Sequence, residues 1–178
     1  MQQEITTNGK LLNPDGSLAQ VGWARSQNLD CNLEDAHFYT LKAFQPFRIK
    51  RWDYYAVFTP QRFFSATIAD LGYAGNVFVY HMDFTTRQLH EEGLVIPFGK
   101  GIQLPRNSMT GETVFGNDKA SLKFIVDGKK RHVVVDWKGF DGGKGISADL
   151  SMHELKEHDS MNIVIPIGKQ RFYYNRKI

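Results

Sequence analysis

Apolar and polar side chains alternate along much of this chain, and the spacing of an amphipathic helix is not sustained. The alternation is clearest between residues 49 and 84, where three runs rich in aromatic residues are separated by turn sequences. The runs cover residues 50–58, 63–71 and 77–84. A period of two with many aromatic and β-branched residues is typical of β-strands. This stretch therefore predicts three consecutive strands, around which the rest of the chain is organised.

Similar runs continue toward the C-terminus. Residues 121–126 and 131–137 flank Asp127-Gly128, which predicts a hairpin because Asp-Gly favours tight turns, here with a loop longer than two residues. Further strands are predicted over residues 94–97, 146–152, 161–167 and 171–177, with a polar connection or short edge strand at 87–92, a glycine-containing loop at 98–118 and a short helical or irregular insert at 27–45. About nine or ten short strands with turns between them predict an all-β fold, an antiparallel barrel or curved sandwich.

Composition and charge narrow the class of protein. Hydrophobic residues make up 42% of the chain and charged residues 23%, as in ordinary globular proteins. The net charge is only +3 and the basic residues are scattered, which argues against nucleic acid as a partner. Cys31 is the only cysteine, so no internal disulfide forms, in agreement with a reducing compartment. The N-terminus lacks a basic stretch followed by an apolar run, and no apolar run approaches the length of a transmembrane helix, so we expect no signal peptide, no transmembrane segment and a cytoplasmic location.

Several motifs that resemble reactive or binding sites are explained more simply by structure. The glycine-rich stretches 72–76 and 141–145 lack the Gly-Lys-Ser/Thr ending and the following helix of a phosphate-binding loop, so their glycines are predicted to form turns. His81 and Asp83 share a strand face, but a metal site needs three or four converging ligands. We therefore expect no metal and no cofactor.

The candidate site residues are aromatic residues and the carboxylates next to them. Trp52, Tyr54 and Trp137 are predicted to line a ligand-binding wall, with core packing as the alternative. Asp53 and Asp136 are the catalytic candidates, since a carboxyl buried among apolar groups has a raised pKa and can act as an acid. Each could equally accept a backbone hydrogen bond or pair with arginine. Neighbours on a strand point to opposite faces, so Trp52 and Asp53 cannot both line one pocket, nor can Asp136 and Trp137.

Long stretches of the chain resemble a known family. They are LLNPDGSLAQVGWAR, IKRWDYY, FFSATIADLGYAGNVFVY, LPRNS, VDWKGFDGG, SMNIVIPIG and RFYYNRKI. These stretches resemble the uncharacterised family called domain of unknown function 2804, which is similar to the lipocalin-like superfamily containing hydroxyneurosporene synthase, a carotenoid hydratase. The resemblance implies two consecutive lipocalin-like barrels or curved sheets. Because family members continue past RFYYNRK, we expect residues 1–178 to be a single β-rich domain, the N-terminal part of a longer chain whose second barrel is its partner.

Two main hypotheses for the function follow. In the first, the protein is a binding module that holds an apolar small molecule or lipid in an aromatic-lined β-barrel cavity. In the second, it is a cofactor-free hydratase, isomerase or cyclase acting on a prenyl-like or lipid substrate, with a buried aspartate as the acid and aromatic rings that stabilise a cation. A structural role in a larger assembly is a third possibility. The sequence leaves the ligand and the presence of catalysis open.

Overall fold

The computed structural model describes residues 3–155, 159–168 and 171–178, and the chain divides into two compact units. Unit 1 comprises Met1–Gln45, Arg106–Met109 and His153–Ile178, and unit 2 comprises Pro46–Pro105 and Thr110–Met152. Each unit has its own cluster of buried apolar side chains. The two units are therefore described separately.

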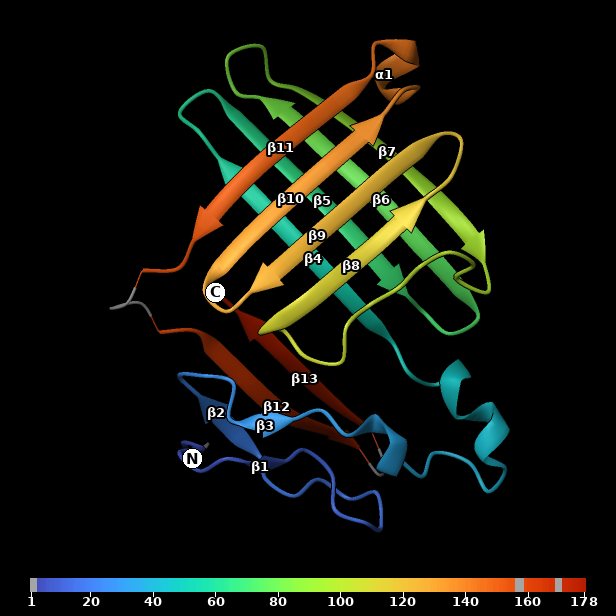
Figure 1. Ribbon diagram of the computed structural model, residues 1–178, viewed down its shortest axis with the longest axis vertical. Coiled ribbons are helices and arrows are strands. Elements are labelled where there is room, and N and C mark those ends of the chain that lie inside the picture. Colours follow the sequence, from blue (N-terminus) through green and yellow to red (C-terminus); the bar gives the residue numbers. More distant parts are fainter. Residues whose placement is uncertain (1–2, 156–158, 169–170) are drawn as a thin grey trace. The chain divides into compact units, whose positions relative to one another are not determined.

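Unit 2 is built from two four-stranded antiparallel sheets that follow each other in the sequence. The strands are β4 (Arg51–Phe58), β5 (Arg62–Asp70), β6 (Ala74–Asp83), β7 (Gln88–Pro97), β8 (Thr110–Gly116), β9 (Ala120–Asp127), β10 (Lys130–Trp137) and β11 (Ile146–His153), and the short helix α1 (Phe140–Gly143) joins β10 to β11. One sheet has the order β4-β5-β6-β7 and the other β8-β9-β10-β11. The sheets lie face to face and their strands cross (Figure 1). The predicted all-β antiparallel fold is confirmed, the arrangement of unit 2 is compatible with the predicted curved sandwich, and the pairings among the described residues do not close a sheet into a barrel.

The centre of this sandwich is filled with side chains from both sheets. Ile68 and Val77 from one sheet, and Leu122, Phe124 and Val133 from the other, expose no surface to water. A side chain with no surface accessible to a water-sized sphere lines no cavity, so the middle of the interior is closely packed. The rings of Tyr55 and Phe124 meet edge to face across the sheets, with centroids 5.1 Å apart.

Unit 1 contains two smaller sheets. Its strands and 3₁₀ turns are β1 (Gly9–Lys10), β2 (Gly22–Ala24), β3 (Leu29–Asp30), η1 (Leu33–Asp35), η2 (Lys42–Phe47, which crosses into unit 2), β12 (Met161–Gly168) and β13 (Arg171–Lys177). β1 pairs with β3 in parallel, and β12 lies between β13 and β2 in an antiparallel sheet. Leu11, Leu12, Leu29 and Val164 form the centre of its core.

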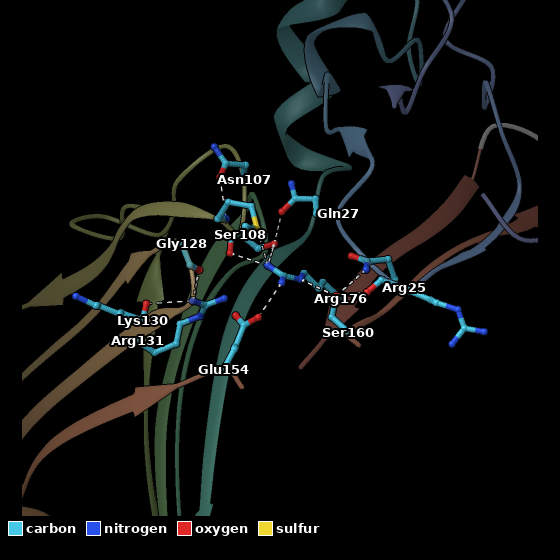
Figure 2. Close-up of polar contacts among 12 residues, drawn as sticks. Arg25, Gln27, Asn107, Ser108, Gly128, Lys130, Arg131, Glu154, Ser160 and Arg176 are labelled. Carbon is cyan, nitrogen blue, oxygen red and sulfur yellow. Dashed lines mark hydrogen bonds and ion pairs between the residues drawn. The ribbon is translucent and has the colours of Figure 1, made fainter. Parts of the chain in front are cut away.

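Arg176 on β13 organises the polar contacts of unit 1 (Figure 2). Its side chain donates to the hydroxyl of Ser160, to the carbonyl oxygen of Ser108 and to the carboxylate of Glu154. Ser108 in turn donates to the side-chain oxygen of Gln27 at 2.6 Å. These bonds hold residues 106–109 against the rest of unit 1.

Most predicted strands are present, two predictions are wrong and a third is confirmed only in part. Residues 88–97 form one continuous strand, β7, at the edge of its sheet, so the edge-strand alternative for residues 87–92 is confirmed, whereas the predicted separation from a strand at 94–97 is wrong. The region predicted as a loop between residues 98 and 118 contains β8. The hairpin loop between β9 and β10 has only two residues, because Asp127 pairs with Lys130. The glycine-rich stretch after β5 forms a turn as predicted: Gly72 has a φ of +79°, and a Cβ there would collide with the carbonyl oxygen of Pro46.

Candidate functional site

The outward-pointing side chains of the sheet β4–β7 form the first candidate site, called here the aromatic face. The strand registers place these side chains in four rows that run across the sheet. The rows are Phe58–Phe63–Met82–Leu89, Ala56–Ser65–Tyr80–Glu91, Tyr54–Thr67–Phe78–Gly93 and Trp52–Ala69–Asn76–Val95. Within these rows Glu91 is the single charged residue. The face is therefore aromatic and aliphatic, although it lies outside the core of the sandwich.

Much of the aromatic face is exposed to solvent. Trp52 is 42% exposed and Tyr54 is 50% exposed, and Phe58, Leu89 and Val95 are exposed as well. Contiguous exposed apolar patches of this kind mark binding surfaces more often than scattered apolar residues do. The strand alternation of β4 thus presents two of the predicted ligand-binding residues, Trp52 and Tyr54, side by side to solvent.

The centre of the aromatic face contains short polar side chains from β5. Ser65 lies between Ala56 and Tyr80, and Thr67 lies between Tyr54 and Phe78. Both are buried, and within the described part of the chain neither hydroxyl has a hydrogen-bond partner. The neighbouring hydroxyl of Tyr80 donates a hydrogen bond to Glu91, which is the main cause that raises the pKa of Tyr80. The aromatic face therefore contains two buried hydroxyl groups that lack a hydrogen-bond partner among the described residues.

Asp53 lies on the opposite side of β4 and points into the sandwich. Its carboxylate accepts a hydrogen bond of 2.9 Å from the hydroxyl of Thr113, and the buried Arg131 contributes attraction. Burial nevertheless raises the pKa of Asp53 above its usual value. A carboxyl that keeps its proton to higher pH can act as an acid, which is the property that the catalytic hypothesis requires.

Because the folded state raises the pKa of Asp53, ionisation of this carboxyl disfavours folding. The protonated carboxyl contributes fully to stability when the pH is below its pKa in the unfolded chain, about 3.9. This contribution is lost as the pH rises through its pKa in the folded state. We expect Asp53→Asn, which retains an acceptor for Thr113, to be more stable than the wild type at pH 7 and equal to it near pH 3. Urea unfolding between pH 3 and 8 measures this difference. Asp136→Asn is the control, since Asp136 is exposed on β10, and an equal gain in that variant would contradict the argument.

The structure separates Trp137 from the other two predicted ligand-binding residues. Trp137 is 3% exposed and packs at the inner side of β10, where its ring meets Phe140 edge to face. Trp52 and Tyr54 lie on the outer side of the other sheet. The predicted opposition within each pair is present: Trp52 points outward and Asp53 inward, whereas Asp136 points outward and Trp137 inward.

A second polar cluster joins β7 to α1 and is not predicted by the sequence. The Nδ1 atom of His90 lies 2.8 Å from one carboxylate oxygen of Asp141, and Lys144 binds the other at 2.7 Å. Glu92 accepts from the backbone N–H of Asp141, whose φ of +50° is in the left-handed region. The hydrogen bond from Lys144, followed by His90, lowers the pKa of Asp141. No local signal could have found this cluster, because its halves are far apart in the sequence.

A cluster of metal ligands is not found in the described residues. Histidine, cysteine, aspartate and glutamate side chains do not gather in groups of three that could hold a metal ion. A hollow in unit 1, lined by residues that include Ile5, Leu29 and Tyr174, has room for about one water molecule. In addition, the helices of the described segments are too short and too polar for any of them to span a bilayer.

Comparison with known proteins yields one match. A family model described as Domain of unknown function (DUF2804) matches residues 2–178. Searches of curated proteins and of solved structures give no match.

Proposed function

Because the chain belongs to the family described as Domain of unknown function (DUF2804), a description that names no activity, we propose a function from the geometry of its surface. The aromatic face binds an apolar small molecule or lipid through Trp52 and Tyr54. The observation that carries this proposal is the exposure of these two neighbouring rings, 42% and 50%, on a face that is almost without charge. Rings held on a strand lose little conformational entropy when a flat ligand stacks against them.

The binding site proposed here differs in position from the barrel cavity that the sequence predicts. The interior side chains of unit 2 are closely packed, so a ligand there would have to displace them. On the aromatic face, a ligand covers apolar surface that is already in contact with water, and this burial favours binding by roughly 25 cal/mol per Å². A role for Trp137 in ligand binding stays a prediction that requires the interior to open.

The proposal predicts that replacing both exposed rings removes the binding of an apolar probe. We expect Trp52→Ser/Tyr54→Ser to weaken the affinity for 2-methylnaphthalene at least tenfold, because the stacking surface is lost while the core is untouched. A fluorescence titration measures the dissociation constant. Phe98→Ser is the matched control, since Phe98 is an exposed aromatic residue that lies beyond the end of β7, outside the four rows.

Two outcomes would contradict the proposal. An equal loss of affinity in Phe98→Ser would mean that the probe binds exposed rings without selectivity. A wild-type dimer that becomes monomeric in the double variant, seen by size-exclusion chromatography with light scattering, would mean that the aromatic face binds a second copy of the chain.

The catalytic hypothesis is retained as a second candidate because of Asp53. Burial favours the protonated form of its carboxyl, and Tyr55, two residues further along β4, contacts Phe124 on the facing sheet. An acid next to aromatic rings suits a cofactor-free hydratase, isomerase or cyclase that forms a cation on a prenyl-like substrate. The likeness to lipocalin-like proteins and to hydroxyneurosporene synthase is likewise part of this proposal, and the two successive antiparallel meanders, β4 to β7 and β8 to β11, support it. Assays of geraniol hydration with the Asp53→Asn variant test it.

A further inference from the structure

The unpaired hydroxyls of Ser65 and Thr67 are the feature of unit 2 that packing explains least. Ser65 is 1% exposed and Thr67 is 4% exposed, and in the described part of the chain neither side-chain oxygen has a hydrogen-bond partner. A buried hydroxyl without a partner loses its bonds to water and gains nothing in return. Buried polar groups in folded proteins are almost always paired, so two neighbouring exceptions on one strand call for an explanation.

The two hydroxyls lie in one strip of the aromatic face. Both belong to the outward side of β5, in successive rows of the sheet. The same two rows hold Tyr54 on β4 and Phe78 and Tyr80 on β6, whose rings stand at either side of the short β5 side chains. The rings of Phe78 and Tyr80 meet edge to face at 5.4 Å, which fixes one side of the strip. Tyr54, on the other side, is half exposed and free of this contact.

We infer that the ligand of the aromatic face is an oxygenated planar or isoprenoid molecule, whose hydroxyl or carbonyl group binds Ser65 and Thr67. This inference rests on the proposed function and specifies its ligand class. The apolar body of the ligand stacks on Trp52 and Tyr54, and rotation of the exposed Tyr54 ring opens the path to β5. A hydroxyl on the ligand can donate to one side chain and accept from the other.

The position of the hydroxyls favours a small molecule over a protein partner. They lie at the level of the sheet between longer side chains, where a flat protein surface resting on the rings would not reach them. A plain hydrocarbon would reach them but would leave both unpaired. A single oxygen at the end of a slim ligand satisfies both without disturbing the ladder of β5.

A pair of probes of nearly equal shape tests the inference. 2-Naphthol carries a hydroxyl where 2-methylnaphthalene carries a methyl group, so their difference in affinity reports the hydrogen bonds to the protein. We expect the wild type to bind 2-naphthol about tenfold more tightly than 2-methylnaphthalene. In Ser65→Ala/Thr67→Val the affinities for the two probes should agree within twofold, while the affinity for 2-methylnaphthalene stays the same. Ser121→Ala/Thr85→Val, which removes two exposed hydroxyl groups outside the face, should keep the preference.

The outcomes distinguish this inference from the proposed function. If both probes bind the wild type equally, or if the preference survives in Ser65→Ala/Thr67→Val, the inference is wrong and the proposed function stands. If neither probe binds, both are wrong. Removal of unpaired buried hydroxyls should leave the melting temperature equal or higher. If the double variant does not fold, Ser65→Ala and Thr67→Val are titrated singly, and each is expected to lose part of the preference.

Discussion

Trp137→Ala is expected to destabilise unit 2 by about 3–5 kcal/mol, the usual cost of truncating a buried tryptophan. The ring is 3% exposed and packs against Phe140 at the end of the interior. Its removal forfeits the transfer free energy of the indole and leaves a cavity that β10 cannot close, because Val133 and Val135 on the same strand are held by both sheets. Urea unfolding followed by circular dichroism measures the loss.

Trp52→Ala provides the matched control for this prediction. The same side chain is removed from the same unit, but Trp52 is 42% exposed and points away from the core, so much less apolar surface returns to water. We expect the loss of stability to be a minor fraction of that in Trp137→Ala. Equal losses in the two variants would contradict the division of unit 2 into a packed interior and an open aromatic face.

The pattern of the sequence predicts strands well where both faces of the strand have a consistent character. β4, β9 and β10 were predictable because alternation extends over most of their length, and β5 because it is a short, mostly apolar run bounded by turn sequences. β8 was not predictable, since only Thr113 and Phe115 along it are buried and two of its seven residues are glycine. When so few positions of a strand are buried, its sequence shows no period-two pattern of apolar residues that could be detected.

β7 shows how a distant segment can hide a strand. Four half-buried residues of β7 point toward the sheet β8–β11, and two of these, His90 and Glu92, are polar. The pattern therefore fits a polar connection as well as a short edge strand. In the structure Asp141 provides the partners that these side chains need, through its carboxylate and its backbone N–H. The polar half of β7 is compatible with burial only because α1 approaches it, and a local pattern contains no information about that contact.

The orientation of β4 was open for a related reason. Alternation shows that Trp52 and Asp53 point to opposite sides, but not which side faces the core. The more aromatic side faces solvent, whereas Asp53 faces inward, where Thr113 and Arg131 provide polar partners. Hydrophobicity alone favours the reverse arrangement. This departure from the usual rule is the reason that the aromatic face is a candidate for binding.

Arg176→Met is expected to destabilise unit 1 by about 3–5 kcal/mol, comparable with the loss on breaking other buried ion pairs. The side chains of Arg176 and Glu154 are each only 9% exposed, and the guanidinium lies 3.4 Å from the carboxylate. Methionine keeps the apolar stem in place but removes this cation and the bonds to Ser160 and Ser108. The segment 106–109 should then loosen from unit 1, giving faster amide hydrogen exchange at Ser108 and Met109.

Arg25→Met tests whether burial is the cause of this loss. Arg25 also belongs to unit 1, and it contacts two carboxylates, those of Glu4 at 3.1 Å and Asp159 at 2.8 Å. Its side chain is exposed, so water replaces the lost partners and the pairs contribute little. We expect urea unfolding to resolve a large loss of stability in Arg176→Met and none in Arg25→Met. If the two variants lose the same stability, burial of the guanidinium does not determine the effect, and the argument is wrong.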